Sequence, residues 1–400
     1  MIDPSSCRIP RILRPRRAAP ADAVRPTRAE VNLGALRQNL HVVRSHAGRG
    51  AVWPVLKADA YGHGAPAVAR TLERAGADGF CVALYEEGLE LREAGIRAPI
   101  LVMGGYYGHV HREVIERHLV PVVYDIAQVE GFAQIVRVGE IEGPIRLHVK
   151  VDTGMGRLGV TLRELPGFAA RLAKIPEVMV EGLMTHLAGA DAGGEESARE
   201  QVECFEQARL VLLRVGIRPE VEHVANSAGL FRGVGMYQAV RPGIALFGVS
   251  PRIGDGEAMT PDLRDVMRVR TEIVAVRELS KGDRVGYNFE WSALRASRIA
   301  TVPMGYADGL SRLVSNSGFM LVRGQRVPVV GVVSMDLTTI DITNVSGASV
   351  GDEVVVLGSQ EGPRGRDSIT VDEIALRTRT IPYEILTSIS RRVPRFYREP

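Results

Sequence analysis

One lysine in this chain stands at the end of an apolar run, where burying its charge is unfavourable unless the lysine has a chemical function. Lys57 directly follows a short apolar run, and Tyr61 and two glycines come within the next seven residues. Burial at a strand end disfavours the charged ammonium and lowers the lysine pKa. One function for such a lysine is a Schiff base with a carbonyl cofactor, while the Tyr61 hydroxyl and backbone N–H groups hold a phosphate. The alternative is a lysine that simply emerges into solvent at the end of a strand.

A second motif is rich in glycine. Gly154, Gly156 and Gly159 satisfy G-x-G-x-x-G between a predicted strand and a predicted helix. Taken alone, this spacing is typical of a dinucleotide-binding turn, with Glu177 or Glu181 as the carboxylate that binds the ribose. The match is weak by itself, so a dehydrogenase is one alternative at this point.

The elements that must position these residues follow two patterns. Over residues 28–256, β-prone runs alternate with longer helical stretches, and eight such runs match the count and size of a (β/α)8 TIM barrel. Periodicity alone also allows a doubly wound sheet. Residues 257–400 carry short β-prone runs broken by Gly, Asp and Asn, which predicts a mostly β C-terminal domain. The predicted barrel strands are Val52–Leu56, Gly79–Ala83, Ile100–Met103, Val120–Tyr124, Ile145–Val151, Met179–Thr185, Val221–Ala225 and Ala239–Arg241. The predicted β-prone runs of the second domain are Val266–Val276, Arg284–Tyr287, Arg298–Val302, Phe319–Val322, Val327–Val333, Thr338–Ile342 and Glu353–Leu357, with helices at Val371–Leu376 and Pro382–Ser388.

Several longer motifs resemble those of the alanine racemases. The string around Lys57 is similar to the cofactor-lysine motif of that family, and the ten residues 150–159 are similar to its signature. Matches continue at 286–288, 305–309 and 332–336. The resemblance covers about residues 28–398. It implies an α/β fold with an N-terminal barrel that binds pyridoxal phosphate, and an isomerase that interconverts L-alanine and D-alanine, supplying D-alanine for peptidoglycan.

The resemblance also implies roles for individual residues. Lys57 would hold the cofactor and serve as one catalytic base, and Tyr287 would be the second catalytic base. Arg157 and Met335 would bind the substrate carboxylate, and Lys150 would be a candidate for carbamylation. The residues implied to bind the cofactor are Lys57, Tyr61, His186, Asn226, Ser227, Arg241, Gly243, Ile244 and Tyr383.

Arg241 carries the most mechanistic meaning among these. In the family pattern it faces the pyridine nitrogen, and His186 hydrogen-bonds it. An arginine cannot give up its proton, so the ring nitrogen stays unprotonated and the ring is a poorer electron sink. The sites implied by the resemblance fall at the carboxyl ends of predicted strands, which favours a barrel over a doubly wound sheet.

Composition excludes several function classes. The net charge is only +3, and residues 1–27 hold six Arg against two Asp, so the remainder offers no electrostatic footprint for nucleic acid. Three cysteines without metal-ligand spacing argue for a reducing, cytoplasmic compartment and against a metal site. No apolar run approaches the length of a membrane span. Residues 1–27 are predicted to be a disordered tail, because no apolar segment follows Arg16-Arg17 to make an export signal.

Two further points follow from the resemblance. In the family, the β domain of one subunit covers the barrel mouth of the other, so a homodimer is expected in which Tyr287 and Met335 act on the partner's site. The alternatives are a broad-specificity or serine racemase of the same fold, an amino-acid decarboxylase, and a single-domain carrier of pyridoxal phosphate without turnover. Tyr383 favours alanine over serine, because relatives that favour serine often lack it.

Overall fold

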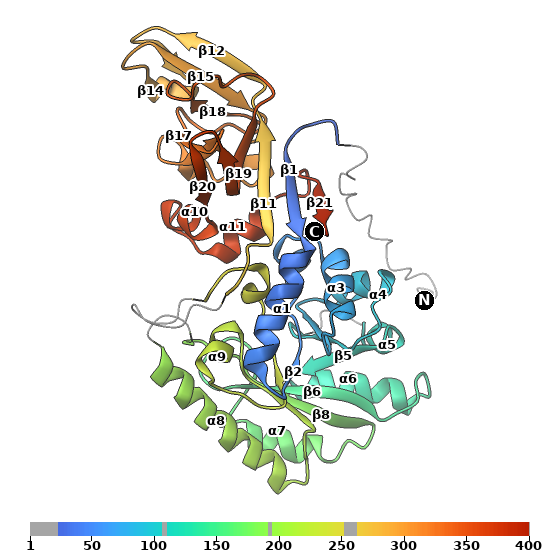
Figure 1. Cartoon of the computed structure of the whole chain (residues 1–400). Helices are drawn as coiled ribbons and strands as arrows, with labels where there is room; N and C mark the ends of the chain where they lie inside the picture. Colours follow the sequence, from blue (N-terminus) through green and yellow to red (C-terminus); the bar gives the residue numbers. More distant parts are fainter. Residues whose placement is uncertain (1–22, 106–109, 191–193, 252–261, 400) are drawn as a thin grey trace.

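The computed structural model describes residues 23–105, 110–190, 194–251 and 262–399. The chain forms an α/β unit and a β-rich unit, which lie at opposite ends of the molecule (Figure 1). Residues 1–22 of the predicted tail and the predicted domain boundary at 256/257 lie outside the described residues. Among the helices in the described ranges, none is long and apolar enough to cross a membrane.

The α/β unit is a closed parallel barrel. Its strands are hydrogen-bonded in the order β2-β10-β9-β8-β6-β5-β4-β3. A parallel bridge between Val55 and Cys81 joins the two ends, and Leu56 N donates to Cys81 O at 2.8 Å. The (β/α)8 prediction is therefore confirmed, and each of the eight predicted runs contains or overlaps one barrel strand. The strands are β2 (Ala51–Val52), β3 (Phe80–Val82), β4 (Ile100–Val102), β5 (Leu119–Val123), β6 (Ile145–Asp152), β8 (Val178–Met184), β9 (Val221–His223) and β10 (Ala239–Val240), and the short β7 (Val160–Thr161) pairs with β6.

Helices connect these strands and cover the outside of the barrel (Figure 1). The first of them is capped at its N-terminus by Asn32, whose Oδ1 accepts a hydrogen bond from Ala35 N at 2.9 Å. Its apolar residues Leu36, Leu40 and Val43 recur at helical spacing and are buried against the barrel. The helices are α1 (Leu33–Ala47), α3 (Ala65–Arg74), α4 (Tyr85–Glu93), α5 (His111–Glu116), α6 (Ile126–Arg137), α7 (Leu165–Leu172), α8 (Glu195–Arg214), α9 (Ser227–Arg232) and the 3-10 helix η3 (Ile244–Phe247).

The second unit is mostly β, as predicted. One sheet has the order β17-β16-β19-β11-β1-β21, with β20 paired to β19, and a smaller sheet has the order β12-β15-β18. The predicted run Val327–Val333 ends early: β17 stops at Pro328, Val329 makes only an isolated bridge with Ile340, and Gly331 then turns the chain with a φ of 75°. The elements are β1 (Arg28–Asn32), β11 (Met267–Glu272), β12 (Ala275–Leu279), β13 (Arg284–Val285), β14 (Trp291–Ser292), β15 (Ser297–Val302), β16 (Phe319–Val322), β17 (Gln325–Pro328), β18 (Thr338–Asp341), β19 (Glu353–Gly362), β20 (Gly365–Ile369), α10 (Val371–Arg377), α11 (Pro382–Ser388) and β21 (Arg395–Arg398).

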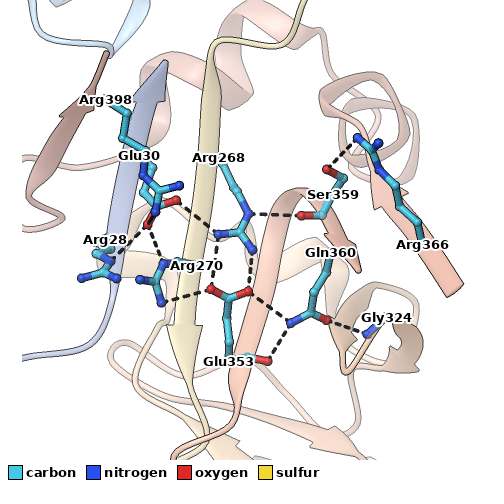
Figure 2. A network of polar contacts seen from close by, with 10 residues as sticks. All are labelled: Arg28, Glu30, Arg268, Arg270, Gly324, Glu353, Ser359, Gln360, Arg366 and Arg398. Atoms are coloured by element: carbon cyan, nitrogen blue, oxygen red, sulfur yellow. Dashed lines mark hydrogen bonds and ion pairs between the residues drawn. The ribbon is translucent and has the colours of Figure 1, made fainter. Parts of the chain in front are cut away.

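An ion-pair network ties the first strand of the chain to this larger sheet (Figure 2). The carboxylate of Glu30 on β1 is 4% exposed and lies 2.6 Å from both Arg270 Nε and Arg398 Nη2. Arg268 bridges Glu30 and Glu353, so that β1, β11, β19 and β21 share one network. Because β1 pairs with β11 and β21, it belongs to the larger sheet of the β-rich unit, although the predicted domain boundaries place its residues in the barrel segment.

Candidate active site

A cavity opens at the carboxyl ends of the barrel strands. The side chains that line it follow β2, β4, β8, β9 and β10, and one comes from α11 in the second unit. Active sites of barrel enzymes are built at this end. The cavity brings together nine of the residues predicted from the sequence, which are Lys57, Tyr61, His186, Asn226, Ser227, Arg241, Gly243, Ile244 and Tyr383. Val55, Met103 and Ala228 also line it, and the sequence analysis did not identify them.

A strained turn, α2 (Lys57–Tyr61), holds the lysine. The four residues after Lys57 all have φ between 51° and 58°, a left-handed conformation that costs about 1–2 kcal/mol for each non-glycine residue. Such strain persists only where the surroundings impose it. Glu87 Oε1 accepts a hydrogen bond from the N–H next to Lys57 (2.6 Å), and Arg395 Nε donates to Gly62 O (3.0 Å). Both units of the fold therefore hold the turn that aims the lysine.

One end of the cavity is suited to a phosphate. Asn226 caps α9 by accepting from Gly229 N, and Ser227 Oγ accepts from Gly243 N, both at 2.9 Å. The N-termini of α9 and η3 thus meet at the cavity, where backbone N–H groups favour an anion. A Cβ at Gly243 would lie 2.3 Å from Tyr61 Oη, so only glycine allows the hydroxyl this close. Burial raises the pKa of Tyr61, which keeps this hydroxyl protonated as a donor.

Arg241 lies almost fully buried at the wall of the cavity. Its Nη1 lies 2.7 Å from His223 Nδ1, and its Nη2 donates to Thr185 O at 2.6 Å. The imidazole that bonds this arginine in the structure is that of His223, and the role of His186 as its partner stays a prediction. Burial, Arg241 and Lys57 lower the pKa of His186 to about 3, which keeps its imidazole neutral beside these cations.

Two amines in the site have lowered pKa values. Burial lowers the pKa of Lys57, Arg157 lowers it further, and Glu87 opposes them. Lys150 is buried on β6, and burial, followed by Arg241 and Arg157, lowers its pKa to about 8. Cations outnumber carboxylates here, so the site favours an anionic ligand.

Arg157 lies exposed in the turn after β6 and is not among the residues that line the cavity. Within this turn, Asp152 Oδ1 accepts hydrogen bonds from Gly154 N at 3.0 Å and from Gly156 N at 3.1 Å. The chain then continues into β7 and not directly into a helix. The turn that opens directly into a helix, which a dinucleotide-binding motif requires, is therefore absent, and the dinucleotide interpretation fails.

Two predicted residues do not line the cavity of their own chain. Tyr287 is 67% exposed and Met335 is 52% exposed, and neither lines the cavity. Tyr287 lies between β13 and β14, and β14 lies at the end of the molecule opposite the barrel (Figure 1). The loop that holds Met335 packs against the 305–309 motif, because Tyr306 N donates to Ser334 O and Ala307 N to Met335 O, each at 3.0 Å.

The sequence alone did not single out His223 as a site residue. A histidine inside the predicted barrel strand Val221–Ala225 was the available signal. No group of three or more His, Cys, Asp or Glu suited to a metal ion occurs within the described ranges.

A barrel with a lysine on a strained turn, a phosphate-type cradle and a buried arginine defines the class of barrel proteins that bind pyridoxal phosphate. Comparison with known proteins identifies the family. Residues 31–251 match the model for "Alanine racemase, N-terminal domain", and residues 266–397 match that for "Alanine racemase, C-terminal domain". This chain belongs to the alanine racemase family.

Individual relatives agree with this assignment. The alanine racemase of Sorangium cellulosum is 58% identical over 384 residues, covering 94% of this chain and 100% of the relative. The alanine racemase of Geobacter sulfurreducens is 40% identical, covering 94% of this chain and 98% of the relative. The solved alanine racemase from Bacillus anthracis with bound L-Ala-P has a TM-score of 0.86 at 33% identity, covering 94% of this chain and 96% of that one. The one from Bartonella henselae with covalently bound pyridoxal phosphate has a TM-score of 0.83 at 28% identity, covering 93% and 99%.

Proposed function

We propose that this chain is an isomerase that interconverts L-alanine and D-alanine on pyridoxal phosphate and supplies D-alanine for peptidoglycan. The observation that carries the proposal is the single cavity that joins Lys57, the phosphate-type cradle and Arg241. The two curated relatives described above are both named as alanine racemases.

The residues present fit pyridoxal phosphate. Ser227, the Tyr61 hydroxyl and the N–H groups at Gly243 and Ile244 would hold the phosphate, and Lys57 would form the Schiff base. Gly243 is the sharpest test of this fit, because a side chain there would fill the space in which the Tyr61 hydroxyl lies. When bound, the cofactor supplies an electron-accepting ring that makes the α-proton of the amino acid acidic.

The side chains of this protein would then move that proton. Lys57 would take or return the α-proton on one face, and its lowered pKa favours the free amine that this needs. Tyr287 serves the opposite face, since racemisation needs a base on each side of a planar carbon. Arg241 keeps its proton, because burial lowers its pKa only to about 10, so a ring nitrogen that faces it stays unprotonated. A weaker electron sink suits an enzyme that moves only a proton.

We infer a homodimer in which Tyr287 and Met335 complete the partner's cavity. Both are exposed and do not line the cavity of their own chain, and several apolar neighbours in the same unit are also exposed. Exposed apolar side chains of this kind mark interaction surfaces. They are Tyr287, Phe289, Tyr306, Leu313, Met335 and Leu337. Sedimentation equilibrium should give about twice the 43.5 kDa chain mass, and a monomer at micromolar concentration would contradict the shared site.

Other candidates fit less well. A carrier protein without turnover would lack the second domain, whereas this chain has it and matches the family's C-terminal model. A broad-specificity or serine racemase remains the second candidate, and the presence of Tyr383 in the cavity favours alanine. We also place the protein in the cytoplasm, because Cys81 and Cys204 are unpaired among the described cysteines.

Circular dichroism of L-alanine over time, with purified protein loaded with pyridoxal phosphate, tests the proposal. The signal should decay to zero at constant total alanine, and L-serine should decay far more slowly. Lys57→Ala protein is the control and should leave the signal unchanged. An unchanged L-alanine signal from unsubstituted protein that holds the cofactor would refute the proposed activity.

A further inference from the structure

A polar chain runs through the barrel interior, away from the cavity. Arg241 Nη1 lies 2.7 Å from His223 Nδ1, and His223 Nε2 lies 2.8 Å from His148 Nδ1. His148 Nε2 lies 3.8 Å from Glu181 Oε2. Both imidazoles are fully buried, and Glu181 lines a second cavity at the amino-terminal mouth of the barrel. This chain of polar side chains, from Arg241 through His223 and His148 to Glu181, therefore connects the active-site cavity to the opposite end of the barrel.

Donor and acceptor chemistry gives this chain a direction. Arginine has only N–H donors, so His223 Nδ1 must accept and the His223 proton must lie on Nε2. That N–H points at His148 Nδ1, which must also accept, so the His148 proton lies on Nε2 and faces Glu181. Burial, then Arg241, lowers the pKa of His223, and burial lowers that of His148, so each ring carries one proton. Every N–H donor in this series of side chains therefore points away from Arg241 and towards Glu181.

The fold makes room for this arrangement. The pairing register between β6 and β8 shifts opposite His148, which leaves Glu181 as the extra residue of a bulge. Bulges re-aim side chains, often next to functional sites. A Cβ at Gly182 would lie 2.3 Å from His148 Nδ1, so only glycine leaves space for the ring. Trp53 packs against both imidazoles, with ring centroids 5.7 Å from His148 and 5.5 Å from His223.

The far end of the chain needs an acceptor. His148 Nε2 is buried without a hydrogen-bond partner, and a buried N–H in that state is unfavourable. A shift of about 1 Å by the Glu181 carboxylate would bring it to ordinary hydrogen-bond distance. The other oxygen of Glu181 accepts from Arg146 Nη1 at 2.9 Å, so the carboxylate stands between the buried chain and the outer surface.

We propose that His148 and Glu181 are positioning residues for Arg241 and, through it, for the ring of the bound cofactor. The Glu181 carboxylate polarises both imidazoles, which makes His223 Nδ1 a stronger acceptor and holds the guanidinium in place. Without an acceptor at position 181, His148 can reverse its tautomer. Reversal along the chain would then set an N–H of His223 against an N–H of Arg241. This inference rests on the proposed function and deepens it.

Binding of pyridoxal phosphate to variants at position 181 tests the inference. Glu181→Ala should weaken cofactor binding by about tenfold, as the loss of an outer-shell partner does at comparable sites. It should also shift the absorption band of the bound cofactor, which a merely structural role would not do. Glu181→Gln, which keeps an acceptor oxygen, should restore the affinity to within about threefold. Arg146→Gln is the matched control, because it removes the outer partner and keeps the carboxylate.

Two results would overturn the inference. One is a Glu181→Ala protein whose affinity and spectrum match those of Arg146→Gln, and the other is a Gln variant as impaired as the Ala variant. Neutron diffraction from the unsubstituted holoenzyme tests the direction of these hydrogen bonds without any variant. It should show deuterium on Nε2 and not on Nδ1 of both His148 and His223, and deuterium on either Nδ1 would refute the direction. A protein that binds no pyridoxal phosphate would instead refute the proposed function, while the tautomers of the cofactor-free protein would still test the chain.

Discussion

Arg25 is expected to stabilise the second domain from within the segment predicted as a tail. Its Nη2 lies 2.7 Å from Asp308 Oδ1 and its Nη1 lies 3.0 Å from Oδ2, and Asp308 is fully buried while Arg25 is 28% exposed. Removing one partner of a buried pair costs about 3–5 kcal/mol. Here the cost should be nearer 2 kcal/mol, because Arg25 is partly solvated and Asp308 keeps Gly305 N at 3.1 Å and Arg392 Nε at 3.5 Å.

The substitution Arg25→Gln should therefore lower the free energy of unfolding by about 2 kcal/mol, measured by urea titration of the holoenzyme. Asp308 also orders the motif that packs against the Met335 loop, so the KM for alanine should rise more than kcat falls. Arg37→Gln is the control, because the Arg37–Glu399 pair is exposed and 3.5 Å long, and should cost less than about 0.5 kcal/mol. Equal effects of the two substitutions would refute this reasoning.

Two further predictions concern the site. Gly62→Ala would place a Cβ 2.3 Å from Leu386 O, whereas the control position Gly76 has a similarly positive φ but open space around it. In urea unfolding, Gly62→Ala should therefore lower the free energy of unfolding by at least about 1 kcal/mol more than Gly76→Ala does. It should also slow cofactor loading. Equal costs would show that contact with the second unit is unimportant. Lys150, with a pKa of about 8, is an unprotonated amine above that pH, so its nitrogen can bond carbon dioxide, lose a proton and form a carbamate. The ¹³C carbamate signal from labelled bicarbonate should rise between pH 7 and pH 9 and be absent from Lys150→Ala, and a signal that is independent of pH or of Lys150 would contradict this prediction.

Local pattern was sufficient to predict the barrel. Its strands are buried on both faces, so they appear in the sequence as short apolar runs between helical stretches. The pairing of the first strand could not be predicted this way, because Arg28 pairs with Arg270, some 240 residues away in the chain. Nothing in the local sequence of residues 28–32 shows which sheet will take up that strand.

The site residues that belong to a sequence motif could be predicted. The contacts between them could not, because these depend on how the folded elements are arranged. Eight of the nine predicted residues meet in one cavity because the carboxyl ends of neighbouring strands converge, and Tyr383 reaches it from α11. His186 follows one predicted strand and His223 lies inside another, and only the structure shows that His223 lies 2.7 Å from Arg241. The separation of Tyr287 from Lys57 depends on how the two units are arranged, which sequence pattern does not report.

Subunit complementation tests most directly the central claim, that Lys57 and Tyr287 of different chains form one site. Lys57→Ala and Tyr287→Phe proteins, each inactive, would be mixed in equal amounts, exchanged under mild denaturant and assayed for racemisation of L-alanine. Random exchange puts both defects into one site of each mixed dimer and leaves the other intact, so about a quarter of the unsubstituted activity should return. No recovery, after mass spectrometry has verified mixed dimers, would contradict the shared site.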